Sequence, residues 1–312
     1  MDAIHTPVLQ EELIRYLGPR KEAELMIDAT QGEGGHSLAF LTCFPDLKLI
    51  GIDADPEIQE IARERLKIFG DRVEFFSCWS QDFFSAYPAS LDQPDTILID
   101  LGISLFHYEK SGRGFSFRKD EKLDMRIRNG SGKSAAELIA GIPEKELADL
   151  LYANADERYS RQIAREIIRA RALGSITSSK ILAEIVEKAL PHTDSHVHGA
   201  TKTFLALRIA VNGELSRLPG FLESAFKVLK IGGRMGVISF HSLEDRIVKN
   251  FFRAKNRDCK CPPEAPICRC EGHRMVNLLF KKGITPGQEE IRFNPPSRSA
   301  RLRIVEKIFD EV

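Results

Sequence analysis

The stretch LMIDATQGEGGHS, residues 25–37, constrains the fold more than any other part of the chain. It opens with an apolar run that suits a strand buried in a parallel sheet. Asp28 ends this run, and a glycine-rich turn over residues 32–35 leads into an expected helix over 36–44. Strand, glycine turn and helix make the first half of a nucleotide-binding βαβ unit, in which the glycines let a ligand lie against bare backbone.

An acid at the end of the next expected strand indicates what this turn could bind. Asp53 follows Gly32 by 21 residues (53 − 32), close to the ~20 expected for a carboxylate that binds a ribose hydroxyl. Ser37 replaces the third glycine of the dinucleotide fingerprint, and Asp28 and Glu33 would repel a pyrophosphate. A ligand with an amino or sulfonium cation would not be repelled, so the pattern favours S-adenosylmethionine over NAD. The alternative is a tight turn that binds nothing.

Three expected strands end in an acid, at Asp28, Asp53 and Asp100. The carboxyl ends of parallel strands meet at one edge of an open α/β sheet, where the ligand crevice lies. An acid after a strand can also be a helix cap, which could explain each of the three singly. Their recurrence predicts an α/β fold with carboxylates along a ligand-binding edge.

The composition bounds the class of protein. A hydrophobic share of 43% and a charged share of 29% are those of a soluble globular chain. No apolar run approaches the ~20 residues of a membrane span, and the start of the chain lacks the features of a signal peptide. We therefore expect a cytoplasmic protein with no membrane partner. Its 45 basic and 45 acidic residues give zero net charge, so a nucleic-acid partner would require cations gathered on one face.

A second informative stretch, residues 100–130, has few helix-period positions and many glycine, serine, arginine and aromatic residues. Irregular segments of this length inside a compact domain are usually functional. Aromatic rings stack on bases while arginines bind phosphates, so the mixture predicts contact with single-stranded nucleic acid. The alternative is a loop whose aromatic rings pin it to the core. The candidate contact residues here are Arg113, Phe115, Arg118 and Arg126.

From Ser134 onward the sequence carries helix signals without strand signals, which breaks the βα alternation. Ser134 with Glu137 is a capping box that marks the start of the first of these helices. We predict an inserted all-helical domain over residues 110–205. The main domain then consists of residues 1–109 and 206–312.

One helix of the expected insertion carries arginines at four-residue spacing, which places them on one face. This face could contact phosphates, or it could be a solvated face that forms ion pairs with Glu157 and Glu166. The three residues are Arg161, Arg165 and Arg169.

After the insertion, helices are expected over residues 203–218 and 220–229. Ser242 and Asp245 have the spacing of a capping pair at the start of a further helix. His241, just before them, could face the ligand crevice or serve the cap. Near the C-terminus, the basic loop NPPSRSAR contains Arg298, another candidate phosphate contact.

Four cysteines near the C-terminus form two CxC pairs. Cytosolic cysteines are more often thiols or metal ligands than disulfides. Four thiolates could close a tetrahedral site for a structural zinc, although zinc sites use CxxC more often than CxC. Zinc binding is therefore one expectation and unligated thiols are the other. The residues are Cys259, Cys261, Cys268 and Cys270.

Six segments together resemble one family, the bacterial ribosomal small-subunit RNA cytosine-N4 methyltransferases. In chain order they are DATQGEGGHS, DLGIS, SGRGFSFRKDEKLDMRI, HGATKTFLALRIAVNGEL, ISFHSLEDRIVKNFF and NPPSRSARLRI. The resemblance extends over residues 5–306, and the third and fifth segments carry most of its specificity.

The resemblance implies a Rossmann-like class I methyltransferase sheet interrupted by a helical insertion. It implies S-adenosylmethionine as the methyl donor. The implied acceptor is the exocyclic N4 amine of one cytosine in the decoding region of 16S rRNA, in the small ribosomal subunit. The sequence is also compatible with a homodimer. A similar cysteine cluster occurs in some members of the family.

The cofactor contacts of the family carry over to positions that match its motifs, namely Gly34, Gly35, His36, Asp53 and Asp100. This chain departs from the family at two further cofactor positions. Ser80 stands where phenylalanine is usual, and His107 stands where glutamine is usual.

For the chemistry, we expect Asp100 and Ser104 to orient the acceptor amine or the cofactor beside it, without a covalent cysteine intermediate. Three other functions stay open on the sequence alone. A methyltransferase for a small molecule or protein would explain the glycine turn but not the arginine-rich and aromatic segment. A DNA cytosine-N4 methyltransferase would share the chemistry. A non-catalytic RNA-binding factor would not consume the cofactor.

Overall fold

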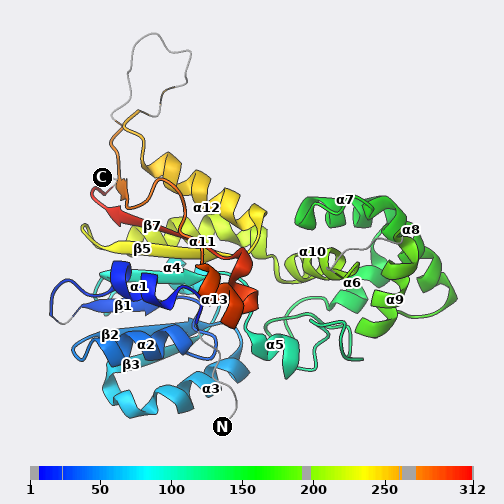
Figure 1. Cartoon of the computed structure of the whole chain (residues 1–312), viewed down its shortest axis with the longest axis horizontal. Helices are drawn as coiled ribbons and strands as arrows, with labels where there is room; N and C mark the ends of the chain where they lie inside the picture. Colours follow the sequence, from blue (N-terminus) through cyan, green and yellow to red (C-terminus); the bar gives the residue numbers. More distant parts are fainter. Residues whose placement is uncertain (1–6, 23, 192–197, 260, 262–271, 311–312) are drawn as a thin grey trace. The chain divides into compact units, whose positions relative to one another are not determined.

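The computed structural model describes residues 7–22, 24–191, 198–259, 261 and 272–310 (Figure 1). The chain divides into two compact units, one made of residues 1–102 and 217–312 and the other of residues 103–216. The expected limits of the insertion, 110 and 205, both lie inside the second unit. No helix among the described residues is both long enough and apolar enough to cross a membrane.

The first unit is built on a sheet with the strand order β3-β2-β1-β4-β5-β7-β6. β1 to β5 run parallel, whereas β7 runs antiparallel to both of its neighbours. This arrangement is the Rossmann-like sheet of class I methyltransferases, so the predicted fold class is confirmed. The strands are β1 (Leu25–Asp28), β2 (Lys48–Asp53), β3 (Val73–Ser77), β4 (Thr96–Asp100), β5 (Arg234–Ser239), β6 (Val276–Leu278) and β7 (Arg301–Lys307).

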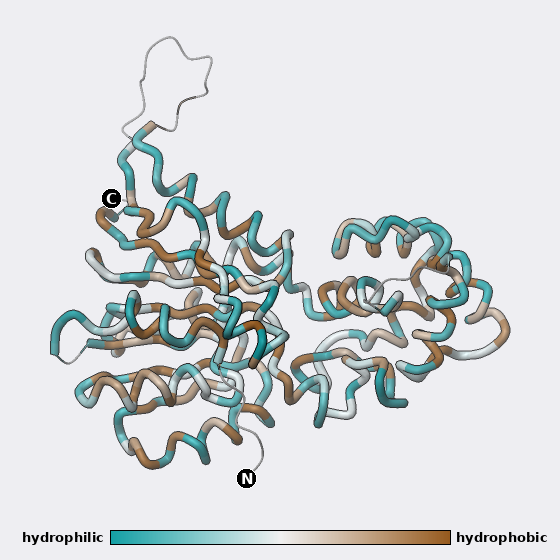
Figure 2. Tube along the Cα trace, in the orientation of Figure 1, coloured by the Kyte–Doolittle hydropathy of each residue, from teal (hydrophilic) through white to brown (hydrophobic). Residues whose placement is uncertain are grey.

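Helices cover both faces of this sheet, and alternate strand residues point into two apolar layers. Met26 packs into one layer, while its neighbour Ile27 packs into the other. The strands are accordingly apolar along most of their length (Figure 2). The layer around Met26 contains α1 (Gln10–Leu17), α2 (Gly35–Cys43) and the end of α3 (Pro56–Leu66). The layer around Ile27 contains α4 (Ser80–Ser85), α11 (Glu214–Val228) and α12 (Ser242–Lys255).

Two short segments complete the first unit, α13 (Gln288–Phe293) and the 3-10 turn over Pro295–Ser299. A further 3-10 segment, Lys67–Arg72, continues from α3. β6 has only three residues. A run this short gives no periodic signal, and for that reason the sequence did not predict it.

The second unit is helical and has its own apolar core. α7 packs against both α8 and α10, and α8 packs against α9. The capping box at the start of α6 is confirmed, since Ser134 Oγ accepts a bond from Glu137 N and Glu137 Oε2 accepts one from Ser134 N. The helices are α5 (Leu105–Glu109), α6 (Ala135–Gly141), α7 (Glu144–Ala155), α8 (Ser160–Leu173), α9 (Ser179–Ala189) and α10 (Thr201–Asn212).

The expected helix break at residue 219 was wrong. α10 ends at Asn212, and α11 runs from Glu214 through Pro219 to Val228. The break falls at Gly213, whose φ of 64° gives α10 a left-handed C-cap. Pro219 is the sixth residue of α11, so its missing N–H removes one helical hydrogen bond near the start of the helix.

The expected cap of α12 was also wrong. His241 is the N-cap, and its ring accepts a bond from Glu244 N at 3.5 Å. Glu244 Oε2 accepts bonds from the backbone N–H groups of Phe240 at 2.9 Å and His241 at 3.3 Å. Asp245 instead binds Arg303 of β7 through both of its carboxylate oxygens. Of the two roles left open for His241, the capping role is the one that the structure shows.

Candidate active site

The three acids predicted to share one edge of the sheet do so. Asp28, Asp53 and Asp100 end β1, β2 and β4. These strands are parallel neighbours in the order β2-β1-β4. Their carboxyl ends therefore meet at the edge where open α/β sheets bind ligands.

The glycine turn after β1 is tied to the end of β2. Gln31 N donates to Ile52 O at 2.9 Å, and Gly32 N donates to Asp53 Oδ2 at 2.8 Å. Asp53 Oδ1 accepts a further bond from Asp55 N at 2.8 Å. The same carboxylate thus fixes the turn and the start of α3, which orients Asp53 at the sheet edge.

Gly34 closes the turn in a conformation that other residues rarely adopt, with φ of 77°. A Cβ atom at this position would lie 3.2 Å from Leu66 Cδ1 and 3.3 Å from Ala62 Cβ of α3. Both the backbone conformation and the close approach of α3 therefore require glycine. Gly34 is also the N-cap of α2, so this geometry sets the direction of the helix that carries His36 and Ser37.

Behind the turn lies a buried polar cluster. Asp28 is 1% exposed, and its Oδ2 accepts a bond from Ser37 Oγ at 2.6 Å. Ser37 Oγ also accepts from Gln31 Nε2 at 3.3 Å. Gly51 makes room for this amide, because a Cβ there would lie 2.0 Å from Gln31 Nε2. The sequence did not predict Gln31 or the hydrogen bond from Ser37 to Asp28, since the partners of both side chains are set by the folding of the turn.

Several polar atoms of this cluster are buried without a hydrogen-bond partner in the described part of the chain. They include Asp28 Oδ1, both ring nitrogens of His36 and Asp100 Oδ1. His36 Nε2 lies 3.4 Å from Asp100 Oδ2, within ion-pair range but without hydrogen-bond geometry. Burial raises the pKa of the Asp28 carboxyl above its ordinary value, and nearby His36 opposes that rise. Because buried polar groups are normally paired, such a concentration marks a functional site.

Ser80, the predicted cofactor residue after β3, is buried at the start of α4. Its hydroxyl donates to the backbone oxygen of Ala29, at the beginning of the glycine turn. This bond gives Ser80 a positioning role in addition to the predicted contact. The neighbouring Trp79 ring lies against the Arg217 guanidinium, 4.7 Å from its centroid. This cation–π contact joins the start of α4 to α11, two elements far apart in sequence, and was not predicted.

Ser104 and His107 belong to the second unit. Ser104 is the N-cap of α5, and its Oγ accepts a bond from Phe106 N at 3.1 Å. His107 is buried, and its ring centroid lies 5.2 Å from that of Phe115. The backbone of Asp100, in the first unit, is held by Thr30, whose Oγ1 accepts a bond from Asp100 N at 2.6 Å.

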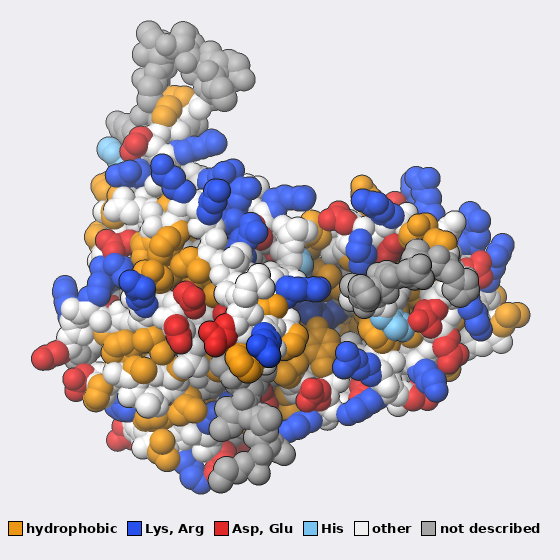
Figure 3. All heavy atoms as spheres, viewed as in Figure 1, with side chains coloured by type: hydrophobic (Ala, Val, Ile, Leu, Met, Phe, Trp, Pro, Cys, Tyr) orange, Lys and Arg blue, Asp and Glu red, His pale blue; other side chains and the backbone are white. Residues whose placement is uncertain are grey.

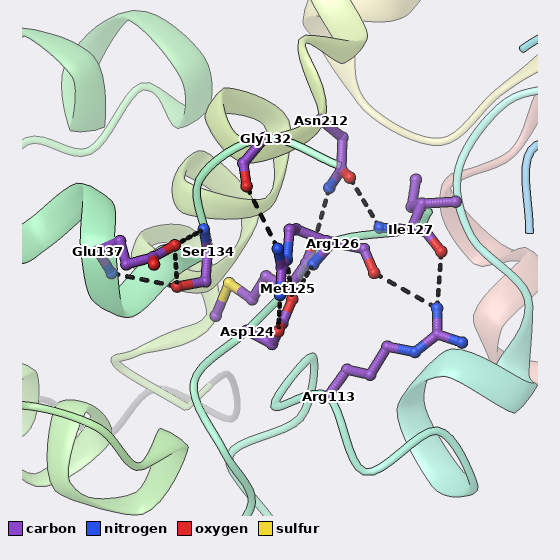
Figure 4. Close-up of polar contacts among 9 residues, drawn as sticks. All are labelled: Arg113, Asp124, Met125, Arg126, Ile127, Gly132, Ser134, Glu137 and Asn212. Atoms are coloured by element: carbon purple, nitrogen blue, oxygen red, sulfur yellow. Dashed lines mark hydrogen bonds and ion pairs between the residues drawn. The ribbon is translucent and has the colours of Figure 1, made fainter. Parts of the chain in front are cut away.

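The segment expected to contact nucleic acid is folded around its own arginines (Figure 4). Arg113 is only 6% exposed and donates through Nη1 to Ile127 O at 2.6 Å. Phe115 is 4% exposed and belongs to the helical core. Of the two readings of this segment, the pinned loop therefore fits Arg113 and Phe115, because their side chains stabilise the segment from within. Arg118 and Arg298 are exposed, as a phosphate contact requires.

Arg126 is held by a neighbouring acid. Its Nε and Nη2 donate to the two carboxylate oxygens of Asp124, at 2.7 Å and 2.6 Å. Its Nη1 donates to Gly132 O at 3.2 Å. Desolvation raises the pKa of Asp124, but the hydrogen bonds and charge of Arg126 outweigh it and hold that pKa below its ordinary value. The fork is therefore occupied within the chain, and Arg126 orders this segment rather than presenting a free guanidinium.

Asn212, at the end of α10, clamps the same segment from the other side (Figure 4). Its Nδ2 donates to Met125 O and its Oδ1 accepts from Ile127 N, both at 2.8 Å. Met125, one of the two clamped residues, has a φ of 60°, which is unusual for a residue other than glycine. Such a conformation persists only where the surroundings enforce it. The clamp spans more than eighty residues of sequence and gave no local signal.

Almost the whole chain matches one family. Residues 2–308 match the MraW methylase family. The chain belongs to the MraW methylase family. It is therefore an enzyme, a methyltransferase that uses S-adenosylmethionine.

This methylase resembles curated proteins over almost its full length. It is 53% identical over 310 residues to the ribosomal RNA small subunit methyltransferase H of Treponema denticola, covering 99% of this chain and 98% of that one. It is 44% identical to the protein of the same name from Syntrophobacter fumaroxidans, covering 97% and 96%. A solved rRNA methylase from Streptococcus thermophilus matches 96% of this methylase and 94% of its own chain, at 10% identity and a TM-score of 0.42.

The residues at the sheet edge of this methylase fit its cofactor. A sulfonium and an amino group both carry positive charge, and Asp28, Asp53 and Asp100 surround the edge with carboxylates. The buried atoms without hydrogen-bond partners in the described chain supply further donors and acceptors. Gly34 has no side chain, which lets the turn pack directly against α3, where a Cβ atom would be in close contact with Leu66 and Ala62. The chemistry of the donor set therefore suits S-adenosylmethionine.

The zinc prediction rests partly on residues outside those that the structure describes. Cys268 and Cys270 lie outside the described residues. Of the other two cysteines, Cys259 is exposed and Cys261 is half-buried. Within the described ranges, no three His, Cys, Asp or Glu side chains come together as metal ligands. A structural zinc therefore stays a prediction.

Proposed function

We propose that this methylase transfers a methyl group to the exocyclic N4 amine of one specific cytosine in the decoding region of 16S rRNA. The main support for this proposal is the 53% identity, over 99% of the chain, to a ribosomal RNA small subunit methyltransferase H. The sequence segments LDMR and SFHSLEDR support the cytosine-N4 chemistry, because they are specific to the family that the chain resembles. The acceptor RNA is presented in the small ribosomal subunit.

Gly34, Gly35, His36 and Asp53 hold the cofactor in this proposal. Their place at the carboxyl edge of β1 and β2 supports it. Ser80 and His107 are proposed to contact the cofactor as well, at the positions where the family has phenylalanine and glutamine. When bound, S-adenosylmethionine would supply a methyl group activated by its sulfonium. The bond from this methyl to the cytosine nitrogen would form as the C–S bond breaks, with S-adenosylhomocysteine as the leaving group, and the nitrogen would release one proton to solvent.

The remaining task for the protein is to orient the acceptor, because alignment of two reactants supplies much of the rate. The lone pair of a cytosine amine is delocalised into the ring. Acceptors that bind its protons make the nitrogen more pyramidal and more nucleophilic. Asp100 is proposed as one acceptor, since its Oδ1 is buried without a hydrogen-bond partner in the described chain. Ser104, four residues further along, is proposed to assist.

Methylation of small subunits tests this proposal. Subunits from a strain that lacks the enzyme are incubated with the purified protein and methyl-labelled cofactor, and the RNA is digested to nucleosides. Label in N4-methylcytidine is expected. Label in another nucleoside would discard the cytosine assignment. Absence of label, with cofactor binding shown by calorimetry, would point to a different substrate.

Two variants test the proposed role of Asp100. Asp100→Asn is expected to lower turnover by at least ~10²-fold, the usual scale for loss of a positioned polar group at a reacting centre. Asp46→Asn, at an exposed acid of the same unit, is the matched control and should keep full turnover. Full turnover by Asp100→Asn would remove Asp100 from the mechanism.

We also propose that the chain forms a homodimer and binds a structural zinc, and each of these proposals has a direct measurement. Light scattering at several protein concentrations gives the mass of the assembly. Metal analysis of the purified protein gives the zinc content, and less than one zinc per several chains would end the zinc proposal.

A further inference from the structure

A stripe of cations runs along the exposed side of α12 in the first unit. Arg246, Lys249 and Arg253 recur at intervals of three and four residues, the spacing that places side chains on one helix face. Arg257 continues the series just beyond the helix. At 1.5 Å per residue, the three helical cations span about 10 Å. Figure 3 shows lysine and arginine side chains gathered over this helix.

Among the residues that the structure describes, these cations have no acidic partners. None of the four has a carboxylate of the described residues within 4.0 Å. The two acids of α12 are engaged elsewhere, because Glu244 is 3% exposed in the cap and Asp245 binds Arg303. Lys255, at the end of the helix, is paired with Glu223 at 2.7 Å and is not part of the stripe.

The arginine face singled out in the sequence behaves differently. On α8, Arg169 Nη1 lies 2.6 Å from Glu166 Oε1, and Arg165 Nε lies 3.9 Å from Glu144 Oε1. Two of its three arginines therefore have acidic partners, and the third, Arg161, has none within 4.0 Å among the described residues. The expected pairing with Glu157 was wrong, because that buried side chain accepts a bond from Tyr159 N instead. The chain as a whole has zero net charge. The α12 cations, which have no ion pair within the described ranges, are thus a local accumulation of positive charge. Like charges at this spacing destabilise a helix unless a ligand neutralises them.

The character of the surface separates two classes of partner. Interfaces with proteins centre on buried aromatic or aliphatic anchors. The exposed residues of α12 are Ser242, Arg246, Asn250, Arg253 and Ala254, and none is a large apolar side chain. Arginine forks match phosphate oxygens in a bidentate geometry. A polyanionic backbone is therefore the partner that this surface suits.

We propose that the α12 stripe (Arg246, Lys249, Arg253 and Arg257) binds backbone phosphates of the RNA substrate, as a contact surface on the cofactor-binding unit. This inference rests on the proposed function. The contact positions the RNA without reading its sequence, because phosphates carry no base identity. It also explains how a chain of zero net charge can bind RNA.

The test compares two triple variants of the full chain with the same loss of charge. One is Arg246→Gln/Lys249→Gln/Arg253→Gln on α12, and the other is Arg161→Gln/Arg165→Gln/Arg169→Gln on α8. Glutamine keeps helix propensity. The affinity for unmethylated small subunits is measured at several salt concentrations. Cofactor affinity and melting temperature report on folding.

Each phosphate contact contributes about 0.7–0.9 to the slope of log affinity against log salt. We expect the slope of the α12 variant to fall by about 2 to 3, with at least tenfold weaker binding at moderate salt and unchanged cofactor affinity. The α8 variant should keep the parent slope. The single variant Arg253→Gln should lower the slope by about 1 and serves if the triple variant fails to fold.

An α12 variant that folds and binds cofactor but keeps the parent slope would overturn the inference and leave the stripe to an acidic protein. If the parent methylates the subunits in the same preparation, the proposed function survives that result. If the parent neither binds nor methylates them, the proposed function fails, and this inference fails with it.

Discussion

The side chain of Asn212 offers the sharpest test of how the second unit is held together. It is 6% exposed and makes three hydrogen bonds, to Met125 O, Ile127 N and Arg208 O. The substitution Asn212→Ala removes all three without adding bulk or charge. Asn129→Ala, at an exposed asparagine of the same unit, is the matched control.

The expected cost follows from the partners that are left behind. Arg208 O lies inside α10 and keeps a helical bond. Met125 O and Ile127 N lose the partner that the structure shows. An unsatisfied buried group costs about 1–3 kcal/mol. Since Ile127 is half-buried, water can relieve part of its loss, and we expect the total to be about 2–4 kcal/mol. That is a large fraction of the ~5–15 kcal/mol that stabilises a typical domain.

Hydrogen exchange is the assay with the right resolution, because a chain of two units need not unfold in one step. Loss of 2–4 kcal/mol should speed exchange of the Ile127 amide by roughly 30- to 700-fold. Peptides from β1, β2 and β4 should keep the parent rates. The Asn129→Ala control should exchange like the parent throughout.

RNA affinity gives a second readout of the Asn212→Ala substitution. Released from the clamp, Met125 can leave its left-handed conformation, and the segment around Arg126 loses its fixed path. We therefore expect weaker RNA binding with unchanged cofactor affinity. The reasoning would be refuted if the Ile127 amide exchanged at the parent rate and the unfolding free energy shifted by less than about 0.5 kcal/mol, the usual scale of a neutral surface change.

The other predictions concern the first unit. Burial raises the pKa of Asp28 above its ordinary value of 3.8, so the folded chain binds this proton more tightly than the unfolded chain does. The free energy of unfolding therefore falls as pH rises through the raised pKa. Asp28→Asn should remove that fall in urea unfolding of cofactor-free protein, and parallel pH curves for parent and variant would contradict the prediction. Gly34→Ala imposes about 1–2 kcal/mol of backbone strain and a close contact with α3, so calorimetry should show weaker cofactor binding. The control is Gly130→Ala, at a position with a φ of 78° and nothing within 4 Å of an added Cβ. This control should leave the cofactor affinity unchanged. Lys307 is fully buried, and its Nζ donates to three backbone oxygens at the end of α11. Lys307→Met keeps the side-chain volume and should lower the free energy of unfolding in urea by about 2–5 kcal/mol. Lys227→Met, at an exposed lysine, should leave that free energy unchanged.

Much of the cofactor-binding half was predictable because its signals are local. An apolar run, an acid and a glycine turn lie within a dozen residues around Asp28, and the same pattern of strand and acid recurs at Asp53 and Asp100. Parallel strands buried on both faces are apolar throughout, and the carboxyl ends of neighbouring strands must meet at one edge. The sequence alone therefore determined the fold class, the edge that holds the acids and the glycine turn.

Other features depended on contacts between distant residues. The reading of Arg113 and Arg126 as surface cations changed because Ile127 O and Asp124 bind their guanidinium groups. The clamp of Asn212 is a property of the folded helical unit, and it has no counterpart in the local sequence pattern.

The same limit applies to the choice of the arginine-bearing helix that we propose to bind phosphate. On α8 and α12 the cations have similar spacing, so periodicity cannot separate them. The difference lies in the acids nearby. Glu144 and Glu166 pair with two of the three α8 arginines. Asp245 of α12 binds Arg303 on β7 instead of a cation of its own helix. Hydrophobic period and turn chemistry act over a few residues and can be read along the chain. Charge pairing, burial and left-handed backbone are set by neighbours in space, and only the tertiary structure decides them.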